Sequence, residues 1–173
     1  MRRRLTLVTA LLLCAVGATC QRGADGASAA APGIEVRVRG IALDQRSESP
    51  VVILEELRGS RKLPIWIGYP EASAIASELE SVAPPRPNTH DLAKRLVDGL
   101  EGTVARVVVT DLSGGVYYAR IVLARNGRSV EVDARPSDAI ALALRFRAPL
   151  FVQEGLFERA LEEAVGGDEE QRI

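Results

Sequence analysis

The stretch VEVDARPSDAIALALR, residues 130–145, contains the two patterns from which the fold can be predicted. Val130 and Val132 alternate with acidic residues, which is typical of a strand with one buried face. Pro136 then suits the first position of a helix, because that position needs no backbone N–H. The helix predicted over 136–147 is apolar nearly all round, so it should be the most buried helix of the protein.

A second stretch, LPIWIGYPEASAIASELE (63–80), repeats this strand-to-helix pattern and aligns with residues 128–145 at an offset of 65. The alignment makes Gly68 equivalent to Asp133, and Ser73 equivalent to Asp138. Each copy follows a predicted hairpin, so two βββα units are expected to share one core. The predicted fold is a single α+β domain with an internal duplication, whose mixed or antiparallel sheet is packed by helices.

Periodicity and turn signals predict the remaining elements of the folded body. Thr89 is the expected N-cap of a helix, and Asn126-Gly127 is a strong tight-hairpin signal. The predicted strands cover 34–39, 51–57, 62–68, 104–112, 116–125, 128–133 and 149–152. The predicted helices cover 70–82, 89–100, 136–147 and 157–165.

The N-terminus has the pattern of an export signal. Three Arg residues at 2–4 precede an apolar run over 5–18, which is shorter than the roughly 20 residues of a membrane-spanning helix. We expect an exported protein of the periplasm, cell envelope or medium. The expected organisation is a signal peptide over 1–19 with an alternative cleavage near residue 29, a flexible tether over 20–33, a domain over 34–165 and a frayed end over 166–173.

Both cysteines, Cys14 and Cys20, lie in this leader, so the body has no disulfide and no Cys-based metal site. Cys20 ends the segment VGATC, which partly matches a bacterial lipoprotein box. Gly17 and Thr19 depart from the usual pattern. A second interpretation is therefore membrane anchoring through a lipidated Cys20.

The charge balance excludes bulk nucleic-acid binding by a basic surface. The chain has 22 basic and 23 acidic residues, of which residues 1–33 contain four Arg and one Asp, leaving 18 basic and 22 acidic residues in the body. A body of this composition can contact nucleic acid only locally. The sequence is compatible with a homo-oligomer.

The joint between the strand and the helix of the opening stretch has more polar residues than a helix start needs. Ser137 and Asp138 suit the first turn of a helix, where Asp138 can accept hydrogen bonds from backbone N–H groups. Asp133 is not needed as a cap if Pro136 is the first helical residue. In a structural interpretation, Arg135 bridges to Asp133 or Asp138 and holds the joint rigid. In a functional one, Asp133 and Asp138 bind a divalent cation, Mg²⁺ or Mn²⁺, while Arg135 and Ser137 contact a phosphate.

The segment RPNTHD, residues 86–91, offers further candidates. His90 is the only histidine of the chain and a candidate proton shuttle, and Arg86 is a candidate phosphate ligand. The alternative for His90 is a first-turn residue that bonds to solvent or backbone. The catalytic candidates are thus Asp133, Asp138 and His90, and the substrate-binding candidates are Arg86, Arg135 and Ser137. The lack of a His or Cys cluster argues against zinc.

Three segments in this order, LPIWIGYPEASAIASELE, PPRPNTHDL and VEVDARPSDAIALALR, resemble the bifunctional nuclease family over residues 41–157. The resemblance implies an α+β domain and nuclease activity on DNA and RNA, but transfers no catalytic residue. The expected function is metal-assisted hydrolysis of phosphodiester bonds. The alternative is a non-catalytic envelope module that uses the same domain for binding or assembly.

Overall fold

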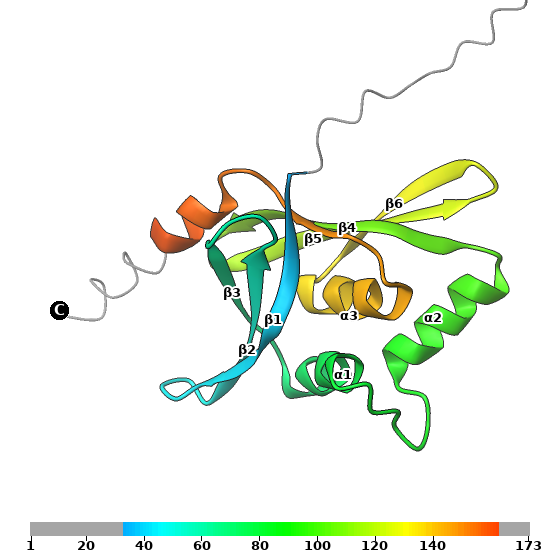
Figure 1. Cartoon of the computed structure of the whole chain (residues 1–173), viewed down its shortest axis with the longest axis horizontal. Helices are drawn as coiled ribbons and strands as arrows, with labels where there is room; N and C mark the ends of the chain where they lie inside the picture. The colour runs from blue at the N-terminus through cyan, green and yellow to red at the C-terminus, as the bar shows by residue number, and fades with distance from the viewer. Residues whose placement is uncertain (1–32, 163–173) are drawn as a thin grey trace, which may run out of the picture.

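The computed structural model describes residues 33–162, in which a seven-stranded sheet is packed by helices (Figure 1). The predicted leader, most of the tether and residues 163–173 lie outside the described residues. The strands are β1 (Ile34–Asp44), β2 (Ser49–Glu56), β3 (Lys62–Trp66), β4 (Thr103–Ser113), β5 (Val116–Arg125), β6 (Arg128–Ala134) and β7 (Leu150–Val152). The helices are α1 (Tyr69–Leu79), α2 (Thr89–Gly99) and α3 (Pro136–Phe146), and a further helix begins at Leu156.

The strand order β3-β2-β1-β7-β4-β5-β6 confirms the predicted duplication. Strands β1, β2 and β3 form an antiparallel meander that leads into α1, and β4, β5 and β6 form a second one that leads into α3. Strand β7 joins the two meanders, antiparallel to β1 and parallel to β4, so the sheet is mixed. The fold is therefore a single α+β domain built from two βββα units.

The predicted offset between the two copies was wrong by two residues. The N-cap residues of α1 and α3 are Gly68 and Arg135, which are 67 positions apart. Gly68 therefore corresponds to Arg135, and Asp138 corresponds to Glu71 in the first turn of α1. Side chains in strands alternate with period two, so the strand patterns fit offsets of 65 and 67 equally well. Both copies thus begin their helix with an acid in the first turn.

Helix α3 is the most buried helix, as predicted. Its residues Ala139, Ile140 and Ala141 are fully buried, and it packs against β4, β5, α1 and α2. Strand residues from both meanders complete this core, among them Val52, Leu54, Val107 and Val109. One shared core therefore fixes the positions of the two strand–helix joints relative to each other.

Helix α2 is attached to the body differently. Its N-cap is Asn88 rather than the predicted Thr89, and Asn88 and Asp91 form a reciprocal capping box. The leucines of its apolar stripe, Leu92, Leu96 and Leu100, are 53–63% exposed, so this stripe does not enter the core. A homo-oligomer stays a prediction. None of the described helices has the length and apolar character needed to cross a membrane.

Candidate functional site

Four polar side chains from three helices meet at the start of α3, and we call them the joint cluster: Glu71, His90, Arg135 and Asp138. His90 Nε2 lies 3.0 Å from Asp138 Oδ1. Arg135 donates from Nε to Asp138 Oδ2 at 2.7 Å and from Nη2 to Glu71 Oε1 at 2.8 Å. The cluster thus combines residues that lie 48 to 64 positions apart in the chain with a local pair.

Local backbone geometry explains how Arg135 reaches both acids. A residue before proline is driven out of helical conformation, and Arg135 has φ −67° and ψ 144° just before Pro136. It is the N-cap residue of α3, as predicted, and Asp138 lies one turn further along. The expectation that Asp138 accepts backbone N–H bonds was wrong, because α3 has no side-chain cap and both oxygens of Asp138 accept from side chains instead.

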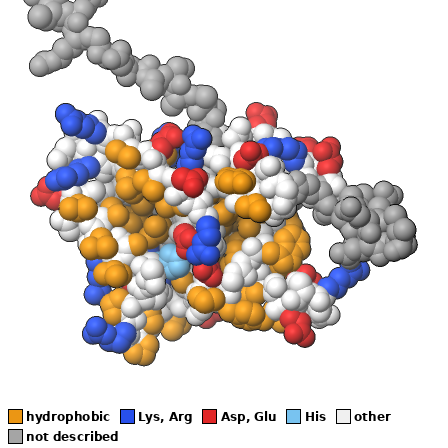
Figure 2. Space-filling model, turned by 180° about the vertical axis from the view of Figure 1, so that it is seen from behind, with side chains coloured by type: hydrophobic (Ala, Val, Ile, Leu, Met, Phe, Trp, Pro, Cys, Tyr) orange, Lys and Arg blue, Asp and Glu red, His pale blue; other side chains and the backbone are white. Residues whose placement is uncertain are grey.

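The cluster is covered on one side and open on the other. The side chain of His90 is only 12% exposed, whereas that of Arg135 is 67% exposed. Figure 2 shows the histidine in the middle of one face of the molecule, beside basic and acidic side chains and between apolar ones. An incoming anion can therefore reach the guanidinium while the imidazole stays held by its neighbours.

Hydrogen bonding fixes the charges of the cluster. Burial raises the pKa of Asp138, but hydrogen bonds from Arg135 and His90 outweigh it and leave that pKa below its ordinary value. Hydrogen bonds to Asp138 and Glu71 raise the pKa of Arg135. At neutral pH Asp138 is therefore a carboxylate, which can only accept a hydrogen bond, so His90 donates to it through Nε2–H.

This arrangement predicts an acid-dependent contribution of Asp138 to stability. Because its native pKa is lowered, the contribution is complete above the ordinary carboxyl pKa of about 3.9 and is lost as pH falls through the native pKa. We expect Asp138→Asn to lower the free energy of unfolding by about 1–2 kcal/mol at neutral pH. Urea unfolding should show this difference narrowing below about pH 4. A difference independent of pH would assign the effect to shape and not to charge.

The structure does not bring Asp133 to the joint cluster. Asp133 is exposed on β6 and lies opposite Arg120 of β5, on the same strand face as Glu131, which accepts from Arg120 at 3.1 Å. The intervening Val132 pairs with the buried Ile121 on the other face. No hydrogen bond or ion pair joins Asp133 to the joint cluster in the part of the chain that the structure describes, and a cation shared by Asp133 and Asp138 stays a prediction.

The predicted cation site has one of its two carboxylates, that of Asp138, in the joint cluster. Asp138 already accepts hydrogen bonds from two side chains at its two oxygens. Within residues 33–162 no group of three or more His, Cys, Asp and Glu side chains is placed to hold a metal ion. A role for Mg²⁺ or Mn²⁺ stays a prediction.

The two remaining substrate-binding candidates lie in different surroundings. Arg86 is exposed in the loop between α1 and α2, and in the described part of the chain it has no hydrogen bond or ion pair with the joint cluster. Ser137 lies next to the cluster in the first turn of α3 and is buried, at 7% exposure. Of these two, only Ser137 adjoins the cluster in the chain.

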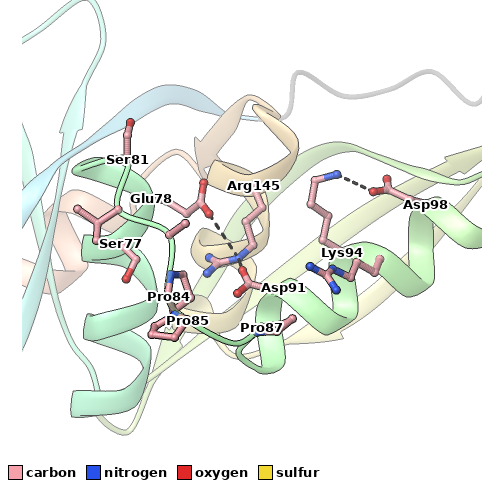
Figure 3. Close-up of a pocket in the computed structure, with 13 residues that line it drawn as sticks. Ser77, Glu78, Ser81, Pro84, Pro85, Pro87, Asp91, Lys94, Asp98 and Arg145 are labelled. Atoms are coloured by element: carbon pink, nitrogen blue, oxygen red, sulfur yellow. Dashed lines mark hydrogen bonds and ion pairs between the residues drawn. The ribbon is translucent and has the colours of Figure 1, made fainter.

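Sequence reasoning missed two charged residues of importance. Glu71 is the counterpart of Asp138, and an alignment at offset 67 would have found it. Arg145 was read as part of an apolar helix, yet its side chain, 2% exposed, donates to Asp91 at 2.7 Å. Figure 3 shows it pointing toward Glu78 and Asp91, in a pocket of about 600 Å³ between α1 and α2. Lys94 and Asp98 form an ion pair on the same wall of the pocket, so most of the charged side chains that line this pocket pair with one another.

One family model and several named plant proteins match this chain under the same family name. The model of the Bifunctional nuclease domain matches residues 52–164. An uncharacterized protein of Mycobacterium tuberculosis is 46% identical over 126 residues, which cover 73% of this chain and 75% of that protein. Bifunctional nuclease 1 of Arabidopsis thaliana is 30% identical over 111 residues, covering 62% of this chain and 34% of the plant protein. Bifunctional nuclease 1 of Oryza sativa subsp. japonica is 27% identical over 112 residues and is also covered to 34%.

Proposed function

Because this chain belongs to the bifunctional nuclease domain family, we propose that it hydrolyses phosphodiester bonds of DNA or RNA at the joint cluster. The observation that carries the proposal is the hydrogen-bonded series His90–Asp138–Arg135, which joins a held imidazole to a solvent-accessible guanidinium. Acid–base catalysis and charge stabilisation at phosphorus need these two groups side by side.

In the proposed reaction Asp138 orients the imidazole and stabilises its protonated form. His90 accepts a proton from the attacking water, the oxygen attacks phosphorus, and the imidazolium returns a proton to the leaving oxygen. Arg135 binds a non-bridging oxygen and neutralises the charge that develops on the phosphorane. The products are a phosphomonoester and an alcohol. Glu71 holds Arg135 from its other side and keeps the guanidinium in place.

A divalent cation stays a prediction that the same assay can test. When bound, Mg²⁺ or Mn²⁺ would supply an electrophile for the phosphate oxygens and a more acidic water. Because the described residues contain no group of three or more possible metal ligands, every step above is assigned to protein side chains. Activity that persists in excess chelator would support this assignment.

The test is cleavage of single-stranded DNA and RNA by the purified protein, with Mg²⁺, with Mn²⁺ and with chelator. Arg135→Lys keeps the positive charge but loses the bidentate hydrogen bonding of the guanidinium, so we expect the cleavage rate to fall roughly 10- to 100-fold. Arg128→Lys, an exposed residue outside the cluster, is the matched control and should cleave like wild type. Absence of cleavage under all conditions would overturn the proposal and favour a non-catalytic binding module.

A further inference from the structure

Two elements at one end of the molecule expose apolar side chains that the fold does not cover. Helix α2 has no buried residue, and neither has β6. Both elements lie on the right-hand side of Figure 1, at the opposite side from β3. We call their apolar side chains the α2–β6 face, which consists of Leu92, Leu96 and Leu100 of α2 and Val130 and Val132 of β6, all 40–63% exposed.

The two parts of the α2–β6 face border one groove. This groove has a volume of about 650 Å³ and lies between the end of α2 and the β5–β6 hairpin. Val97 and Leu100 line it from the helix. Leu123 and its strand partner Val130 line it from the hairpin. The apolar surface of the strand thus continues onto the helix, and a continuous apolar surface marks an interaction site, which scattered apolar residues do not.

Strand β6 is the less protected of the two edges of the sheet. Within residues 33–162 it pairs with β5 alone, in a register without a bulge. The opposite edge strand, β3, is only five residues long and contains Lys62 and Pro64, which hinder pairing with another strand. The seven residues of β6 include neither Lys nor Pro. The free edge of β6 can therefore accept another strand.

We propose that the α2–β6 face joins two copies of the chain, with β6 antiparallel to the partner's β6 and both α2 helices on the same side of the continuous sheet. A second copy fits because β6 itself has the pattern such a strand needs, with valines on the groove side and polar residues on the other. The seven residues of β6 and the eleven of α2 approach the roughly 20–30 residues a side of a standard interface. Such a dimer can form whether or not the protein cleaves nucleic acid.

Charge selects one register for this strand pairing. Because both copies keep their valines on one side of the sheet, each Val130 lies opposite an even-numbered residue of the partner's strand. With the partner's Val132 in that place, Glu131 meets the partner's Glu131. With Val132 opposite the partner's Val132, Glu131 meets the partner's Asp133. Like charges directly opposite each other are destabilising, so we expect Val130 opposite the partner's Val130, which puts Glu131 opposite the partner's Ser129.

The first test is the molar mass of the full chain in solution, measured by sedimentation velocity. We expect a dimer at micromolar concentrations. Val130→Asp and Leu96→Asp each place a like charge from both copies in the interface, so each should raise the dissociation constant roughly 100-fold. Leu43→Asp, at a similarly exposed residue of β1, is the matched control and should dimerise like wild type. Because all three residues are exposed, thermal melts should show that the variants are folded.

Cysteine crosslinking tests the register. In the full chain with Cys14→Ser and Cys20→Ser, Val130→Cys should form a disulfide between two copies under mild oxidation. The reason is that opposed side chains in a sheet have Cβ atoms roughly 4.5–5.5 Å apart. Val132→Cys should not, because its two copies would lie about 13 Å apart along the strands. A monomer at all concentrations, a dimer that Val130→Asp or Leu96→Asp leaves intact, or faster crosslinking of Val132→Cys than of Val130→Cys would overturn the proposal.

Discussion

Replacing His90 by Gln is expected to lower phosphodiester cleavage by roughly 100- to 10,000-fold, the usual contribution of a general acid–base group. Glutamine keeps a hydrogen-bond donor for Asp138 but cannot take up a proton near neutral pH. The measurement is initial cleavage rate at saturating oligonucleotide, together with urea unfolding. If His90 only fastens α2 to α3, the variant will lose stability and keep its specific activity.

Asp133→Asn distinguishes the joint cluster from the two-carboxylate cation site. If the cluster is the site, this variant should cleave like wild type, because Asp133 lies on the strand face that holds Arg120 and Glu131. If Asp133 and Asp138 share a cation, the variant should lose cleavage and its dependence on Mg²⁺ or Mn²⁺. The joint-cluster assignment fails if Asp133→Asn abolishes activity while His90→Gln retains it.

Local patterns were enough to predict most of the fold. The Asn126-Gly127 turn and the proline at the start of α3 are short-range signals, and the structure confirms both. The buried face predicted for the strand with Val130 and Val132 was wrong, because β6 has no buried residue and these two side chains are 63% and 40% exposed. The offset between copies was not predictable in the same way. A period of two cannot distinguish an offset of 65 from one of 67, so Gly68 was matched to Asp133 instead of Arg135.

The candidate site was predictable only in part, because its contacts are long-range. Arg135 and Asp138 are three positions apart and their bridge could be anticipated from the sequence. The contact of His90 with Asp138 depends on how α2 packs beside α3, and no local pattern specifies that packing. The same holds for Arg145, since a single Arg in an apolar helix does not reveal which carboxylate it meets.

Replacing Arg145 by Met is expected to lower the free energy of unfolding by about 3–5 kcal/mol, the usual cost of removing one partner of a buried ion pair. Arg145 donates to Asp91 at 2.7 Å, and also to the carbonyls of Ala74 at 3.2 Å and Ala141 at 3.0 Å. It thus fastens both α1 and α2 to α3, and methionine fills the volume without satisfying these acceptors. Urea unfolding measures the loss, and Arg128→Met is the exposed control.

A double-mutant cycle assigns the cause of that loss. If the loss of stability comes from an unpaired Asp91 carboxylate, Asp91→Asn should lower the free energy of unfolding by less in the Arg145→Met background than in wild type. The difference between the two backgrounds, the coupling free energy, should be about 0.5–3 kcal/mol. Asparagine at this position can still accept the N-cap N–H of Asn88, so the capping box is largely preserved.

Because α2 has no buried residue of its own, loss of Arg145 should also loosen α2, and with it His90, before the sheet unfolds. Hydrogen exchange in Arg145→Met should therefore show faster exchange in α2 than in β4 or β5. Equal protection in all three, or a stability loss below about 1 kcal/mol, would show that α2 is held by contacts other than Arg145.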